Sequence, residues 1–290
     1  MQEQLDSLLT QTHGAWVLFW RDDGSTDGTL GLLRAFAAGP GRGRCVQVGE
    51  SARLGATPSF LLVLRAALAG AFDAFAFADQ DDVWLPGKLA RAIGALSRAE
   101  ADRPVLYCAR QVFVDEKLSP IGLSCRLRRE PGFPAALTQN IATGCTMLMN
   151  RQAALLVAES RPPSAALHDW WAYVLVAGAG GAVLADDTPA VLYRQHGRNL
   201  VGAPKSMWRR AIAASKRGPA VFMNVFRQQV RALAEQPHLL SGPSRDQVQI
   251  LAAALRGSKL DRLRVLRGVA GLHRQTWLET LIFRTWFLLG

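Results

Sequence analysis

Two short clusters of carboxylates are the residues in this sequence most able to do chemistry. One follows Trp20 in the stretch RDDGSTDGT, and the other lies in ADQDDVW. Their six aspartates are Asp22, Asp23, Asp27, Asp79, Asp81 and Asp82. Clustered carboxylates repel one another and lower stability unless a cation or several hydrogen-bond donors face them. A hard divalent cation binds such oxygen ligands and bridges them to substrate phosphates. The clusters are therefore either solvated turns or two halves of a metal–nucleotide site.

The elements before the clusters must position them. Short apolar runs alternate with helical patterns. The first half is expected to form a helix over 3–11, a strand over 15–20, a helix over 29–38, a strand over 45–48, a helix over 58–69, a strand over 74–78 and a helix over 87–98. This alternation predicts an α/β fold with a mostly parallel central sheet. Ligands bind beyond the carboxyl ends of such strands. Because each cluster directly follows a strand, we expect both to lie at one edge of the sheet.

The second half of the chain is less regular. The pattern predicts strands over 105–114, 146–149, 182–185 and 190–194, helices over 151–159 and 168–177, and a basic loop with Arg126, Arg128 and Arg129. From residue 205 the pattern is helical, with breaks expected near 218–219, 237 and 241–243.

The charge of the protein is unevenly distributed. The 290 residues carry a net charge of +11. Residues 1–204 hold 19 basic and 19 acidic side chains, whereas residues 205–290 hold 15 and 4, so the whole excess lies in the C-terminal part. This division indicates two separate regions, a first domain over 1–203 and a basic helical region over 204–290. Basic amphipathic helices with aromatic residues suit an anionic membrane surface. The alternative is that these helices pack on the first domain and expose only a solvated basic face. Nucleic acid is not expected, because no binding-module signature accompanies the charge.

Cysteine usage and the amino-terminal sequence bear on the compartment. The four cysteines (Cys45, Cys108, Cys125 and Cys145) form no C-x-x-C pair, which suits a reducing compartment. Met1–Gln4 is polar, unlike a signal peptide. No uncharged stretch reaches the roughly 20 residues of a membrane span. We therefore expect a cytoplasmic protein. If the basic region binds lipid, the protein would lie at the inner face of the cytoplasmic membrane.

Several motifs together resemble one enzyme family. In order, they are EQLDSLLTQTHGAW, RDDGSTDGT, FADQDDVWLPGKL, TGCTMLMN, HDWW and YRQHGRNLVG. They are similar to inverting glycosyltransferases of family 2, which have the GT-A fold, and most similar to the bacterial rhamnosyltransferase-like, surface-polysaccharide branch. The likeness covers about residues 3–202. It implies a nucleotide-diphosphate sugar as donor, a glycan or lipid-linked acceptor, and Mg²⁺ or Mn²⁺ as cofactor.

The resemblance implies roles for the first two acidic motifs. Asp22 and Asp23 match the motif that meets the base or ribose of the nucleotide. Asp79 and Asp81 match the D-x-D motif, with Asp79 toward the ribose and Asp81 toward the metal. Asp82 is either a turn residue or a partner of those ligands. A metal there offsets the negative charge that develops on the diphosphate leaving group.

The resemblance also points to residues in the second half. Asp169 matches the catalytic base, although His168 stands where the family usually has glutamate. Such a base takes the proton of the acceptor hydroxyl; the alternative is an acid that interacts with a helix dipole. His196 matches a loop position that closes on the metal or diphosphate. Four further residues could line a donor or acceptor pocket, with structural roles as the alternative: Gly144, Cys145, Trp170 and Trp171.

Other protein classes fit less well. An aspartate-nucleophile phosphohydrolase needs an aspartate where Arg21 stands, and no G-x-G-x-x-G follows the first strand as a dinucleotide-binding fold requires. A glycosidase with two carboxylates would not need the D-x-D motif. The main rival is a non-catalytic relative, because this chain starts at the helix that normally follows the family's first strand. We expect the absence of that strand to leave a gap in the sheet, with poor solubility or low activity.

Overall fold

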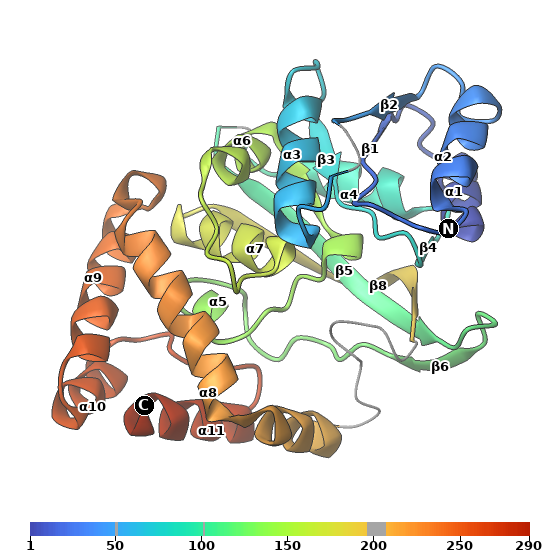
Figure 1. Ribbon diagram of the computed structural model, residues 1–290. Coiled ribbons are helices and arrows are strands. Elements are labelled where there is room, and N and C mark those ends of the chain that lie inside the picture. Colours follow the sequence, from blue (N-terminus) through green and yellow to red (C-terminus); the bar gives the residue numbers. More distant parts are fainter. Residues whose placement is uncertain (50–51, 101, 196–206) are drawn as a thin grey trace.

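The computed structural model describes residues 1–49, 52–100, 102–195 and 207–290, with the side chains of 207–218 left aside. An α/β domain is followed by a group of helices at the carboxyl end (Figure 1). The strands are β1 (Leu18–Trp20), β2 (Cys45–Gln47), β3 (Ala74–Ala76), β4 (Val83–Trp84), β5 (Val105–Val114), β6 (Pro120–Leu123), β7 (Leu148–Asn150) and β8 (Ala182–Arg194). The expected fold class, α/β with a helical C-terminal extension, is confirmed.

Helices cover the sheet and form the C-terminal part. In chain order they are α1 (Gln2–Leu9), α2 (Thr29–Ala38), α3 (Ala56–Leu68), α4 (Lys88–Leu96), α5 (Ala135–Thr138), α6 (Arg151–Glu159), α7 (His168–Gly178), α8 (Met207–Ala234), α9 (Gly242–Arg256), α10 (Lys259–Gly268) and α11 (Trp277–Leu289). Two 3₁₀ turns, Gly144–Thr146 and Pro237–Leu239, complete the described elements.

The main sheet is mixed rather than mostly parallel. Its order is β3-β7-β5-β8-β4, with β6 paired to β5. β5 and β8 are parallel, whereas β7 is antiparallel to both β3 and β5, and β4 is antiparallel to β8. It follows that β3, β5 and β8 point one way and that β7 and β4 point the other. The two strands expected at 182–185 and 190–194 are one strand, β8, whose pairing with β5 shifts register near Arg110.

The strands that precede the two acidic clusters belong to different sheets. β1 pairs in parallel with β2 alone, and β3 is the edge of the six-stranded sheet. Within the described residues no ladder joins β1 to β3, although Phe19 at β1 packs edge-on against Phe72 just before β3, with ring centroids 5.7 Å apart. Among the described residues, β1 and β2 therefore form a sheet separate from the six-stranded one.

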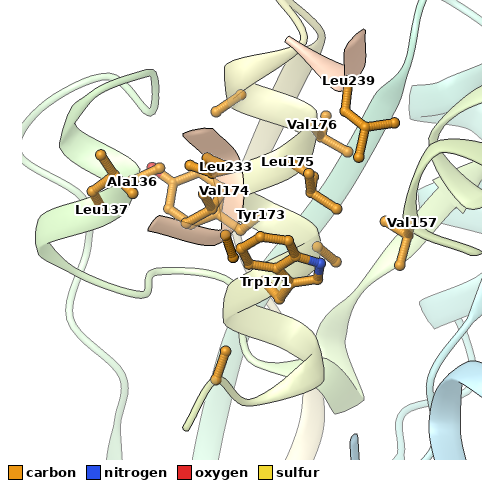
Figure 2. Packing of buried hydrophobic residues seen from close by; sticks show 14 of the residues in the cluster. Ala136, Leu137, Val157, Trp171, Tyr173, Val174, Leu175, Val176, Leu233 and Leu239 are labelled. Carbon is orange, nitrogen blue, oxygen red and sulfur yellow. The ribbon is translucent and has the colours of Figure 1, made fainter. Parts of the chain in front are cut away.

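The largest core surrounds α7, which is apolar on nearly every side. Trp171, Val174 and Leu175 are fully buried among α5, α6 and the C-terminal helices (Figure 2). A helix that is hydrophobic all round must be buried, as this one is. Because α7 begins at His168, the core fixes the position of the carboxylate that follows it.

The C-terminal helices pack on the α/β domain instead of extending from it. Phe226, Phe283 and Phe287 are fully buried in the same core as Trp171. Much of the apolar character that suggested a membrane face therefore belongs to the core. The break expected at 218–219 is wrong, since α8 continues through Pro219, whereas the breaks at 237 and 241–243 are confirmed. In the part of the chain described here, no helix has the length and apolarity to cross a membrane.

Candidate active site

The loop after β1 is closed by its own carboxylates. Asp22 is buried and accepts hydrogen bonds from the backbone N–H groups of Gly24 (3.0 Å) and Ser25 (3.1 Å). Asp27 accepts one from the N–H of Thr29 (3.0 Å), the first residue of α2. Asp22 therefore shapes the turn, and its contact with a nucleotide stays a prediction.

Asp23 ties this loop to the amino end of α3. It accepts hydrogen bonds from the N–H groups of Leu54 (2.7 Å) and Gly55 (2.9 Å), from the hydroxyl of Ser59 (3.0 Å) and from the Arg21 guanidinium (2.6 Å). Desolvation raises the pKa of Asp23, but these donors outweigh it and lower the pKa to about 2. The carboxylate is thus ionised and committed to protein partners, a structural role that the motif alone does not reveal.

The D-Q-D-D turn joins β3 to β4. Asp82 is 1% exposed, and its Oδ1 accepts a 3.3 Å hydrogen bond from the N–H of Arg194 at the end of β8. The Arg194 side chain donates to the carbonyl of Asp81 (3.0 Å) and to Glu3 of α1 (2.8 Å). Arg194, the last residue of β8, therefore connects the acidic turn to α1 through hydrogen bonds within the protein.

Four carboxylates influence one another electrostatically at this turn: Asp79, Asp81, Asp82 and Asp169. Burial raises the pKa of Asp79 to about 8, and the other three carboxylates add to the shift. Burial likewise raises the pKa of Asp82 to about 6. Carboxylates that resist ionisation in this way lack enough positive charge nearby.

The same cluster can hold a divalent cation. Ligand atoms of Asp79, Asp82 and Cys145 lie within 4.8 Å of one another, and Oδ2 of Asp82 has no hydrogen-bond partner among the described residues. Burial and the neighbouring carboxylates raise the pKa of the Cys145 thiol well above its usual value, so the thiol stays protonated and is a poor ligand. The remaining donors are oxygens, which suit Mg²⁺ or Mn²⁺.

Lys88 is a buried lysine within electrostatic reach of Cys145 and Asp82, and its burial was not predicted from the sequence. Lys88 is 2% exposed, and its Nζ lies 3.3 Å from the ring centroid of Trp84 without a hydrogen-bond partner among the described residues. Burial lowers the pKa of Lys88 to about 7, although Cys145 and Asp82 oppose the shift. No sequence signal could have identified it, since a lysine near the start of an amphipathic helix is ordinarily exposed.

Asp169 lies at the first turn of α7, within electrostatic reach of Asp79. Its two oxygens accept hydrogen bonds from the N–H groups of Gly144 (3.1 Å) and Trp170 (2.6 Å). Burial raises the pKa of Asp169 despite these hydrogen bonds and one from the Asn140 side chain. The result is an oriented carboxylate with increased basicity, as a proton acceptor requires.

His168 and Gly144 fix that orientation. The His168 ring stacks on Phe60 with 3.8 Å between centroids, and Phe77 packs edge-on against it. Burial lowers the pKa of His168 to about 3, so the ring is neutral. A Cβ added at Gly144 would lie 2.8 Å from Nε2 of His168, which explains why a glycine stands there. Gly144 serves the close approach of backbone to Asp169 rather than an open pocket.

Two of the residues considered for a sugar pocket lie in the core. Trp171 is fully buried and donates its Nε1–H to Ser160 (2.8 Å), and Cys145 is also fully buried (Figure 2 shows Trp171). Neither can stack on or touch a sugar. Trp170 is half-buried, donates to the carbonyl of Ala136 (2.7 Å) and packs near Phe222. His196, the other metal ligand that the resemblance implies, lies outside the described residues.

The sequence and the fold are both similar to those of known glycosyltransferases. The family model described as Glycosyl transferase family 2 matches residues 1–155. A dTDP-rhamnosyl transferase, RfbG of Shigella flexneri, is 26% identical over 215 residues, which are 70% of this chain and 71% of that protein. The fold is similar to that of S. aureus TarS 1–349 in complex with UDP, with a TM-score of 0.55, 16% identity, and coverage of 91% of this chain and 71% of that one. Against a longer TarS structure the TM-score is 0.51 at 14% identity, over 87% of this chain and 40% of TarS.

Proposed function

The chain belongs to glycosyl transferase family 2 and is a glycosyltransferase, and we propose that it transfers a sugar from a nucleotide-diphosphate donor with inversion at the anomeric carbon. The observation that carries this proposal is the link between Asp169 and the D-Q-D-D turn: Asp169 accepts a hydrogen bond from the N–H of Gly144, and the ligand atom of the next residue, Cys145, lies within 4.8 Å of those of Asp79 and Asp82. The first supplies a base, and the second supplies oxygens for a cation. The rhamnosyl transferase relative supports dTDP-rhamnose as the donor.

Divalent metal is the cofactor that the donor set fits. Asp79 and Asp82, whose ligand atoms lie within 4.8 Å of each other, would hold Mg²⁺ or Mn²⁺ together with Asp81, the metal ligand that the family resemblance implies. When bound, such an ion offsets the negative charge of the departing diphosphate. The chain's own part is to keep these carboxylates together, which the Arg194 clamp on the carbonyl of Asp81 and the N–H bond to Asp82 do.

Asp169 is the residue that we assign to the acceptor side. Inversion by direct displacement requires one carboxylate to receive the proton of the acceptor hydroxyl as the new bond forms. The hydrogen bonds from Gly144 and Trp170 hold Asp169 in one orientation, and burial increases its proton affinity. Asp22 and Asp23 then order the loop on the nucleotide side, Asp23 through its contacts with the start of α3.

The acceptor that we propose is a saccharide or a lipid-linked glycan in cell-surface polysaccharide synthesis. This assignment rests on the resemblance of the sequence motifs to the surface-polysaccharide branch of the family. A lipid-linked acceptor would bring a cytoplasmic enzyme to the inner face of the membrane, where the basic C-terminal region would meet anionic lipid. A non-catalytic relative of the family is the alternative, and the division of the sheet between β1 and β3 is the observation that favours it.

A binding and transfer screen separates these possibilities. Nucleotide-sugars, dTDP-rhamnose among them, are tested for binding and turnover with Mn²⁺, with Mg²⁺ and with chelator. We expect metal-dependent turnover that Asp81→Ala and Asp169→Ala each abolish, while Asp246→Ala, an exposed carboxylate on α9, leaves it unchanged. Failure of every nucleotide-sugar to bind would favour the non-catalytic alternative, and normal turnover by either of the first two variants would remove that residue's assignment.

A further inference from the structure

The outer side of α11 carries exposed apolar residues beside an arginine. Trp277 is 72% exposed and Leu281 is 54% exposed. These residues and the exposed Arg284 are spaced i, i+4 and i+7, so they share one face of the helix. Phe283 and Phe287 point the other way into the core. The helix is therefore fixed in place by one side and offers tryptophan, leucine and arginine on the other.

The basic loop after β6 is held against the start of α11. The backbone N–H groups of Arg128 and Arg129 both donate to Oε1 of Gln275, at 2.8 and 3.1 Å, and Nε2 of Gln275 donates back to the carbonyl of Arg129 (3.1 Å). Gln275 precedes Trp277 by two residues. In Figure 1 this loop runs beside α11 at one end of the molecule. The loop's arginines and the exposed tryptophan thus belong to one surface.

This surface carries more positive than negative charge, although Glu130, an exposed acid next to Arg129, offsets part of it. Burial lowers the pKa of His273, and the charges of Arg129 and Arg284 lower it further. Within the described ranges, Arg128, Arg129 and Arg284 form no ion pair. The acid of α11, Glu279, is 9% exposed and bonded to the hydroxyl of Thr276.

We propose that this surface, the α11 face formed by Arg128, Arg129, Trp277, Leu281 and Arg284, docks the protein on a bilayer that contains anionic phospholipids. Arginines attract anionic headgroups, and a tryptophan with an adjacent leucine inserts at the headgroup level. An acidic macromolecule would satisfy the arginines but would leave the apolar ridge in contact with water. The bilayer satisfies both. The proposal extends the peripheral location given above and does not depend on the transfer chemistry.

Vesicle co-sedimentation without donor or acceptor tests the electrostatic part. The protein should bind vesicles that contain phosphatidylglycerol and bind vesicles of phosphatidylcholine alone much more weakly. Arg128→Gln/Arg284→Gln should lower the partition coefficient by about 25-fold, or about fivefold for each arginine. Arg34→Gln/Arg42→Gln has the same net charge but lies in and just after α2, away from α11, and should change it less than about twofold.

A second pair of variants tests the apolar part. Trp277→Ser/Leu281→Ser should weaken binding to phosphatidylglycerol vesicles. The control Leu32→Ser/Val46→Ser changes two apolar residues that are each 40% exposed, in α2 and β2, and should not weaken it. Equal binding to both vesicle types, or equal losses in test and control pairs, would overturn the proposal, as would binding to an oligonucleotide with no binding to vesicles. Donor binding measured in parallel should be unchanged in all four variants, which separates this result from failure of the proposed function.

Discussion

Binding of Mn²⁺ to the acidic turn should release a proton. Burial and three neighbouring carboxylates raise the pKa of Asp79 to about 8. At pH 7, this carboxyl group is therefore protonated in about ten of every eleven metal-free molecules. Asp82, with a pKa of about 6, is mostly ionised at that pH. Because a metal binds the deprotonated carboxylate, occupancy of the site should release about one proton at pH 7.

Isothermal titration calorimetry in two buffers of different ionisation enthalpy measures this number directly. We expect about one proton per Mn²⁺ at pH 7, and an affinity that rises about tenfold per pH unit between pH 6 and pH 8 and levels off above pH 8. Asp246→Asn should behave like the unmodified protein. Tight binding with no proton release and no dependence on pH between 6 and 8 would refute the account of Asp79.

The same shift determines how stability should vary with pH. A carboxyl whose folded pKa is raised above its unfolded value contributes stability that is fully present below about pH 4 and is lost as the pH rises through about 8. We therefore expect Mn²⁺ to raise the melting temperature more at pH 8 than at pH 6. An equal increase at both values would contradict the proposed coupling.

Two further variants test the supports of the site. Gly144→Ala should lower the free energy of unfolding by about 1–3 kcal/mol and reduce turnover more than donor binding. The new methyl group would contact the stacked His168 ring and displace the N–H that binds Asp169. Normal turnover would show that this N–H is dispensable. Lys88→Met should stabilise the protein by about 1–3 kcal/mol at pH 7 by removing a buried amine without a hydrogen-bond partner among the described residues. Since the pKa of Lys88 is lowered to about 7, the stability lost to its burial grows as the pH falls from about 10 to 7. The gain in chemical denaturation should therefore shrink toward pH 10, and a gain that grows instead would contradict this reasoning.

The local sequence pattern was enough to predict the bounds of some helices and strands. The bounds expected for α2, β5 and α6 match the structure because each has a clear period and clear end signals, such as the N-cap of Asn150, which accepts from the N–H of Ala153. Strand direction was not predictable in the same way. Alternation of strands and helices suggested a mostly parallel sheet, but β7 enters antiparallel between β3 and β5, and no local signal marks that choice.

In the candidate site, the sequence identified several residues but did not predict their surroundings. Motif position pointed to Asp79, Asp81 and Asp169, and in the structure the charges of Asp81, Asp82 and Asp169 all act on Asp79. The commitment of Asp23 to α3, the burial of Lys88 and the core position of Trp171 depend on contacts between segments far apart in the chain. The C-terminal aromatics illustrate the same limit, because an amphipathic pattern does not distinguish a face that packs on a core from one that meets lipid.

The central claim is that the carboxylate cluster performs metal-dependent transfer with inversion. Nuclear magnetic resonance of the product formed from dTDP-rhamnose and a saccharide acceptor reports both features in one measurement. We predict an anomeric configuration opposite to that of the donor, formed only with Mn²⁺ or Mg²⁺ present and absent with Asp169→Asn. Retention of configuration, or transfer that persists in chelator, would contradict the claim.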